Sequence, residues 1–106
     1  MADTPKRLAG PAQLTAASAI QYTVPASTTT IVKQIILHNS DTSGRNVTVG
    51  VGVDAAGTRV LNGVIMAAGE ILSIDCWLVL GAAETLRAHA SVASVVQITV
   101  NGVEVT

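Results

Sequence analysis

Val47-Thr48-Val49-Gly50-Val51-Gly52-Val53 is the most regular stretch of this sequence, because a valine occupies every second position. Successive side chains of a β-strand point to opposite faces, so a period of two places the four valines on one face. We predict that this face packs on an apolar core. The other face carries Thr48 and two glycines, which leave room either for a second backbone to approach, from the N-terminal segment or a neighbouring subunit, or for a bulge that only bends the sheet.

Other β-rich segments lie on both sides of this strand, separated by short runs of Gly, Ala, Ser, Asp and Pro. With the valine strand they cover residues 20–24, 29–39, 45–53, 58–61, 70–80, 84–91 and 95–105. Before them, Pro5, Gly10 and Pro11 interrupt regular structure. The sequence therefore predicts an all-β, single-domain antiparallel sandwich or jelly roll of seven to eight strands at residues 20–106, with an extended N-terminal arm at residues 1–19.

The composition is that of a sheet protein with little polar surface. Of the 106 residues, 49% are hydrophobic and only 12% are charged, against a usual charged share of about 25%. Six basic and seven acidic residues give a formal net charge of −1, which is too balanced for electrostatic attraction to nucleic acid or an anionic membrane. The sequence also lacks a secretory signal pattern, and its apolar runs are far shorter than the roughly 20 residues that span a bilayer. We expect neither nucleic acid nor membrane as a partner.

No residue pattern typical of catalysis or of metal binding is present. His38, His89 and Cys76 are widely spaced, so they predict no converging set of metal ligands. No Gly-x-Ser-x-Gly motif presents a nucleophile, and no amphipathic helix follows the glycines of the valine strand, as a phosphate-binding loop requires. Asp41 and Asp54, both in turns, leave a loop calcium site open as a minor alternative. We expect no enzyme, no catalytic residue, and no metal or other cofactor.

Several segments together resemble small virion proteins of tailed bacteriophages. They are residues 6–14 (KRLAGPAQL), 22–26 (YTVPA), 54–59 (DAAGTR) and 68–70 (AGE), the strand around Trp77, and the closing residues 101–105 (NGVEV). The resemblance implies a β-sandwich subunit on the virion surface, on the capsid or the tail, that resides in the host cytoplasm before assembly. It implies binding rather than catalysis and assigns no catalytic residues.

The expected function is therefore that of a non-enzymatic bacteriophage virion structural protein, most simply a capsid decoration subunit. Its expected partners are copies of itself, with a trimer favoured by analogy, and other virion proteins such as the major capsid protein or tail proteins. The largely apolar faces of residues 31–38 and 71–80 agree with a chain that hides surface in such contacts. The alternatives are a tail or fibre accessory protein, a carbohydrate-binding host-attachment module and, more distantly, a metal-dependent jelly-roll enzyme.

Five residues are candidates for the interface. Two leucines could anchor the arm, two glycines could admit a neighbouring backbone, and one of the two aromatic residues could lie in the core, in an interface or in a sugar platform. These residues are Leu8, Leu14, Gly50, Gly52 and Trp77.

Overall fold

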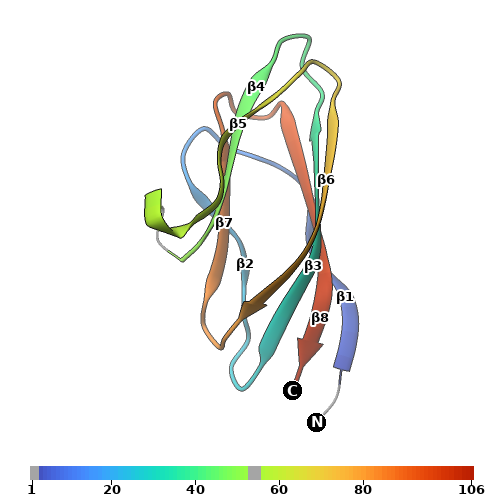
Figure 1. Cartoon of the computed structure of the whole chain (residues 1–106), viewed down its shortest axis with the longest axis vertical. Coiled ribbons are helices and arrows are strands. Elements are labelled where there is room, and N and C mark those ends of the chain that lie inside the picture. Colours follow the sequence, from blue (N-terminus) through green and yellow to red (C-terminus); the bar gives the residue numbers. More distant parts are fainter. Residues whose placement is uncertain (1–2, 53–55) are drawn as a thin grey trace.

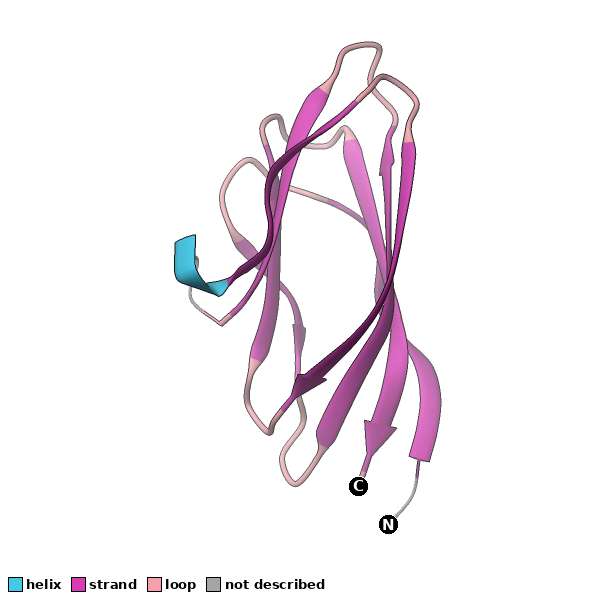
Figure 2. Ribbon diagram, viewed as in Figure 1, coloured by secondary structure: helices cyan, strands magenta, loops and turns pink. Residues whose placement is uncertain are grey.

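The computed structural model describes residues 3–52 and 56–106, which form eight β-strands and one short turn of 3-10 helix (Figures 1 and 2). The strands are β1 (Asp3–Gln13), β2 (Ala19–Thr23), β3 (Thr29–Asn39), β4 (Arg45–Val51), β5 (Arg59–Met66), β6 (Ile71–Leu80), β7 (Thr85–Ala90) and β8 (Val96–Val105). The helical turn η1 (Ala56–Thr58) precedes β5. Two four-stranded antiparallel sheets pack together as two layers, which confirms an all-β sandwich of eight strands.

The first half of the chain pairs with the second half in reverse order. β1 pairs with β8, β2 with β7, β3 with β6 and β4 with β5. Pairing of β3 with β8 and of β4 with β7 then joins these hairpins into sheet A (β1-β8-β3-β6) and sheet B (β2-β7-β4-β5). Because the first strand lies beside the last, Asp3 is opposite Val105, and both chain ends lie at the same end of the sandwich (Figure 1).

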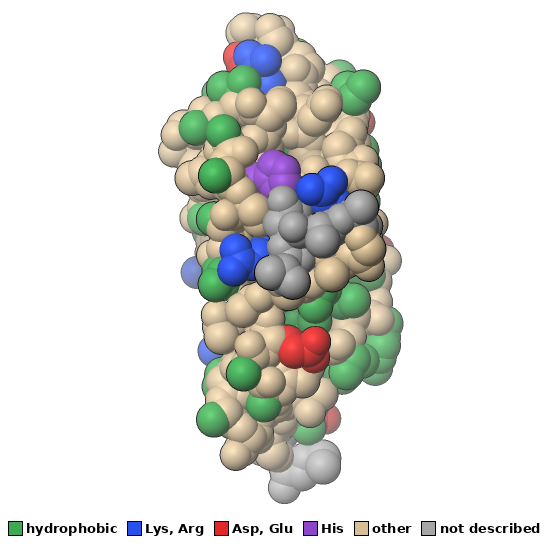
Figure 3. Space-filling model, turned by 90° about the vertical axis from the view of Figure 1, so that its left-hand side faces the viewer, with side chains coloured by type: hydrophobic (Ala, Val, Ile, Leu, Met, Phe, Trp, Pro, Cys, Tyr) green, Lys and Arg blue, Asp and Glu red, His purple; other side chains and the backbone are tan. Residues whose placement is uncertain are grey.

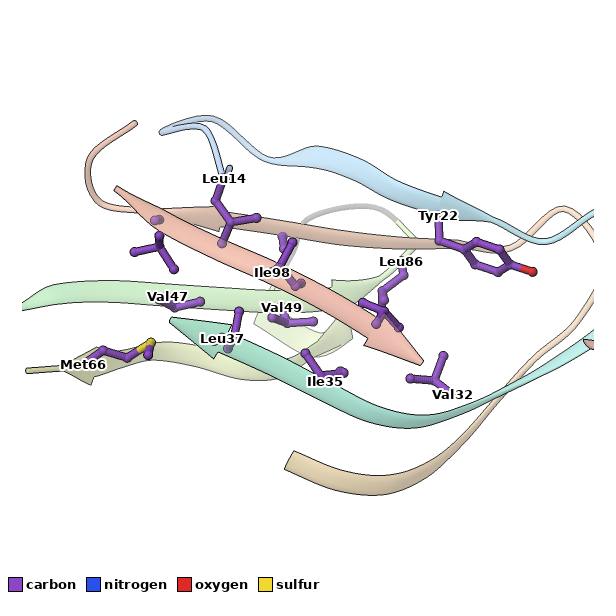
Figure 4. Packing of buried hydrophobic residues seen from close by; sticks show 14 of the residues in the cluster. Leu14, Tyr22, Val32, Ile35, Leu37, Val47, Val49, Met66, Leu86 and Ile98 are labelled. Atoms are coloured by element: carbon purple, nitrogen blue, oxygen red, sulfur yellow. The ribbon is translucent and has the colours of Figure 1, made fainter. Parts of the chain in front are cut away.

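The core fills the space between the two sheets, and the valine strand contributes as its alternation predicts. Val47 and Val49 of β4 are fully buried, and Val51 packs against the same cluster. Figure 4 shows Val49 close to Leu37, which extends from β3 in the opposite sheet. The fourth valine, Val53, lies outside the described residues. The predicted apolar face is therefore confirmed over residues 47–51.

Strand β5 extends beyond its predicted end at residue 61. The alternation stops at Asn62 and Gly63, which the structure accommodates as a register shift against β4. Gly63 has a φ of +60°, and its N–H donates to the Thr48 hydroxyl oxygen at 3.0 Å. After this bulge the strand continues to the fully buried Met66. An irregularity of the backbone, rather than the end of a strand, explains the interrupted pattern.

Residues 3–13 correct the expectation of an extended N-terminal arm, because they form β1, an edge strand of sheet A. The register with β8 shifts twice along β1, so the strand accommodates both Gly10, at a φ of +78°, and Pro11. Prolines are tolerated here because an edge strand uses only one side of its backbone for pairing. Leu14, directly after β1, is fully buried in the core. The segment is thus part of the sandwich.

Candidate interaction surface

Within residues 3–52 and 56–106, no pocket opens and no three His, Cys, Asp or Glu side chains converge as metal ligands. His38 lies in sheet A and His89 in sheet B, which separates the two histidines. The Asp41 carboxylate forms an ion pair with the Arg45 guanidinium at 2.6 Å, and this contact lowers the pKa of Asp41. Asp54 lies outside the described residues. No helix in the described part of the chain is long and apolar enough to cross a membrane. The features that could bind a partner are therefore on the sheet faces.

A row of apolar side chains crosses the outward face of sheet A. Val79 of β6 lies opposite Ile31 of β3, Ile31 lies opposite Val103 of β8, and Val103 lies opposite Pro5 of β1. The row faces outward because the neighbouring position Thr30 is buried on the inward face. Val79 is 55% exposed and Pro5 is exposed, whereas Ile31 and Val103 are half-buried between them. We call Pro5, Val103, Ile31 and Val79 the apolar row.

Trp77 enlarges this apolar surface along β6. It lies two residues before Val79 on the same face of the strand, and 65% of its surface is exposed. The Lys33 ammonium lies 4.4 Å from the centroid of the indole ring, within the range of a cation–π contact. Lys33 therefore covers part of the ring without removing it from solvent.

A row of polar side chains borders the apolar row on the same face. Arg7 lies opposite Asn101, and Asn101 Nδ2 donates to Gln34 Oε1 at 3.1 Å. Gln34 Nε2 in turn donates to Ser73 Oγ at 3.2 Å and more weakly to Asp75 Oδ1 at 3.4 Å. These bonds fix the amide side chains in place. The face therefore combines a fixed polar row with a partly exposed apolar row.

Among the predicted interface residues, the two leucines are used within their own domain. Leu14 is 0% exposed in the core cluster. Leu8 packs at the margin of the same cluster, and its Cδ1 lies 2.8 Å from the position that a Cβ at Gly102 would take. Their apolar side chains pack β1 against its own sandwich instead of contacting a neighbouring subunit.

The two glycines of the valine strand also serve the chain itself. Gly50 is buried, and a Cβ added there would lie 3.1 Å from the carbonyl oxygen of Thr58. The backbone that approaches Gly50 is therefore that of the same chain, just before β5. Gly52 follows the end of β4 with a φ of +77°, a left-handed conformation that favours glycine. Of the five candidates, Trp77 alone is exposed on a sheet face.

The apolar row itself was not predicted as a site. The apolar faces of residues 31–38 and 71–80 indicated that a second layer covers these strands, and Ile31 and Val79 belong to those segments. Pro5 and Val103 carried no such signal, because their contribution depends on which residues lie opposite one another in neighbouring strands. Cross-strand register arises from the tertiary fold and is not visible in local alternation.

A polar cluster closes the end of the sandwich where the termini meet. The Tyr22 hydroxyl, from sheet B, donates to the Glu104 carboxylate of sheet A, and Tyr22 Oη lies 2.8 Å from Thr30 Oγ1. Lys6 Nζ pairs with Glu104 Oε1 at 3.2 Å. Burial, and next the bond to Glu104, raises the pKa of Tyr22 to about 12, whereas the bond from Tyr22 lowers the pKa of Glu104. The cluster links the two sheets and keeps Glu104 ionised at neutral pH.

The outward face of sheet B has a different character from that of sheet A. Figure 3 shows a His side chain on this side of the molecule, with basic side chains beside it. His89 lies opposite Thr48 and Arg87 lies opposite Gly50, so polar side chains occupy the middle of this sheet. We therefore take the outward face of sheet A as the candidate interaction surface.

Neither a protein-family model nor a curated protein matches the sequence at a significant level. The relation to phage virion proteins thus stays a prediction from the segments that resemble them. The function has to be argued from the surface.

Proposed function

We propose that this chain is a non-enzymatic structural subunit of a bacteriophage virion, most simply a capsid decoration protein. The observation that carries the proposal is the apolar row, whose four members lie one on each strand of sheet A, exposed on the two edge strands and half-buried on the two central ones. Burying apolar surface stabilises a contact by about 25 cal/mol per Å². Contiguous exposed apolar patches typically mark interaction sites. The surface therefore favours a protein that works through contacts with copies of itself or with other virion proteins, and the sequence resemblance supplies the phage setting.

We also infer that the sandwich is a jelly roll. Support comes from the reversed pairing of the two chain halves and from the strand orders β1-β8-β3-β6 and β2-β7-β4-β5. This arrangement is what one long hairpin produces when it is wound around a core. Jelly rolls occur in viral capsid domains and in lectins, so the topology is compatible with a virion role and with sugar binding.

Purified particles from the source of the chain provide the direct test. The particles are separated on a density gradient and the chain is sought in the particle band by peptide mass spectrometry. Immunogold labelling with antibodies against the chain then distinguishes the capsid from the tail or a fibre. We expect label on the capsid at many sites per particle. Absence of the chain from a band that contains the other virion proteins would refute the proposal.

Carbohydrate binding is a second candidate, favoured by Trp77 and the polar row beside it. An exposed indole can stack on a sugar ring, and fixed amide and carboxylate groups such as those of Gln34 and Asp75 can bind its hydroxyls. A glycan array tests this function, with Trp77→Ala expected to abolish binding while the fold stays intact. Ile65→Ala is the matched control, because Ile65 is 73% exposed on the edge strand of the other sheet. No binding by the natural chain would eliminate this candidate.

A further inference from the structure

The free edges of sheet A are poorly suited to adding a strand from another molecule. β1 contains Pro5 and Pro11, which have no backbone N–H to donate. β6 has a register shift against β3 between Leu78 and Asp75, the signature of a bulge. Prolines and bulges are devices that prevent pairing at sheet edges. A contact made by sheet A is therefore expected on its face.

Charges of opposite sign flank the apolar row on β1. Asp3, Pro5 and Arg7 occupy successive exposed positions on the outward face, with Pro5 in the row. The alternate position Lys6 points inward, where it pairs with Glu104. At about 3.3 Å per residue, Asp3 and Arg7 lie roughly 7 Å from Pro5 in opposite directions. A rotation of 180° about an axis that lies along the apolar row therefore moves Asp3 to the position of Arg7, and Arg7 to the position of Asp3.

We propose that the outward face of sheet A packs on the same face of a second copy, around a twofold axis along the apolar row. In this dimer the row of one copy covers the row of the other. Arg7 of each copy faces Asp3 of the other, so the symmetry produces two ion pairs. A twofold contact requires a surface that is complementary to itself, and the arrangement of Asp3, Pro5 and Arg7 meets this requirement.

The size of the face is sufficient for such a contact. Its strands are 10 or 11 residues long. With strands about 4.8 Å apart, the face measures roughly 19 by 35 Å, or about 650 Å² in projection. Specific interfaces bury about 600–1,000 Å² on each partner, so the area of the face lies within this range. Because polar residues occupy part of the face, we expect a reversible dimer that dissociates in the micromolar range.

The inference deepens the proposed function and rests on it only for self-association. It names the surface, and it makes a twofold pair the basic contact, in place of the trimer favoured by analogy. Charge reversal can separate the two ideas, because it alters the proposed contact while leaving the core and the other surfaces unchanged.

Sedimentation velocity of the full chain between 1 μM and 1 mM provides the test. The natural chain should dimerise, and D3R or R7D should each weaken dimerisation on the order of ten-fold, because two exposed attractions become two repulsions. An equimolar mixture of D3R and R7D should restore dimers, since one chain then carries two cations beside the row and the other carries two anions. Ile65→Lys, on the far sheet, is the control that should leave dimerisation unchanged.

Circular dichroism establishes that each variant is folded. Val79→Lys is an independent variant in the row itself; it should also weaken dimerisation, and mixing should not rescue it. Association that neither charge reversal weakens, including a stable trimer, would overturn the twofold pair but leave the proposed function standing. A chain that stays monomeric at 1 mM would overturn both the twofold dimer and the self-association in the proposed function. The same holds if a glycan is bound to this face.

Discussion

Replacing Tyr22 with Phe should destabilise the sandwich at neutral pH through one hydrogen-bonded group. The ring stays in the core and no cavity forms, but the hydroxyl that donates to Glu104 and contacts Thr30 is lost. A hydrogen bond to a charged group contributes about 1.5–3 kcal/mol. With an unfolding entropy of about 2.1 cal/mol/K per residue, the melting temperature of this 106-residue chain should fall by about 7–13 °C.

The destabilisation caused by Tyr22→Phe should depend on pH, and the pKa shifts of Tyr22 and Glu104 determine in which direction. The folded pKa of Glu104 lies below its ordinary value of 4.5, so the stability it contributes is present above pH 4.5 and is lost as the pH falls through the folded pKa. The pKa of Tyr22 is raised from 10.0 to about 12, so its contribution is complete below pH 10 and is lost as the pH rises toward 12. The cost of Tyr22→Phe should therefore be constant between these limits and decrease outside them.

A double-mutant cycle of Tyr22→Phe and Glu104→Gln, followed by urea unfolding, measures the coupling. We expect at least about 1 kcal/mol of coupling at pH 7, decreasing as the pH falls below 4.5 through the lowered folded pKa of Glu104. Thr23→Ala, at an exposed neighbouring position in β2, is the control for a change in strand propensity. A stability of Tyr22→Phe within about 0.5 kcal/mol of the natural chain at pH 7 would refute the reasoning, because that is the range of an ordinary surface substitution.

Three further predictions concern the core, the first strand and the glycine beneath η1. Val49→Asp should abolish soluble folding, because a charge at a 0% exposed position costs several kcal/mol; Thr23→Asp should stay soluble in the same expression assay. Deleting residues 2–15 should unfold the chain, because the deletion removes β1 and the buried Leu14. Unfolding would be seen as loss of the β-type circular dichroism spectrum. A retained spectrum would show that sheet A forms without β1. Gly50→Ala should cost about 1–3 kcal/mol in urea unfolding, whereas Gly57→Ala, in open space, should cost little; equal costs would contradict the close approach of Thr58.

Alternation of apolar residues was enough to predict most strands, because one face of each strand must meet the core. Residues 29–39 were predicted with the bounds that the structure has, and the valine strand was predicted with its correct inward face. β1 was missed because Pro5, Gly10 and Pro11 are local signals against a strand, whereas pairing with β8 joins residues about 100 positions apart. Long-range pairing leaves no trace in a local pattern.

The candidate site shows the same division between local and long-range information. Trp77 was predicted as an interface candidate from its residue type, and the structure places it on an exposed sheet face. Leu14 was a candidate from an equally local argument, but in the fold its side chain is buried in the core and its N–H donates to the Val96 carbonyl oxygen at 2.8 Å. Residue type indicates that a side chain needs apolar cover. Whether its own chain supplies that cover depends on the fold.

The interaction surface therefore depends on the segment that the sequence treated as an arm. Leu8 and Leu14 pack inward and hold β1 beside β8, and this placement leaves Asp3, Pro5 and Arg7 on the outward face. An arm detached from the sheet would shorten the apolar row by one strand and remove both charges that make the face self-complementary. Dimerisation should consequently weaken in any variant that loosens β1, even one whose substitution lies inside the core. Leu8→Ala provides such a case: hydrogen exchange should report faster exchange in β1, and sedimentation should report weaker dimers of a chain that remains folded. Unchanged dimerisation alongside faster exchange in β1 would show that the contact does not use this strand.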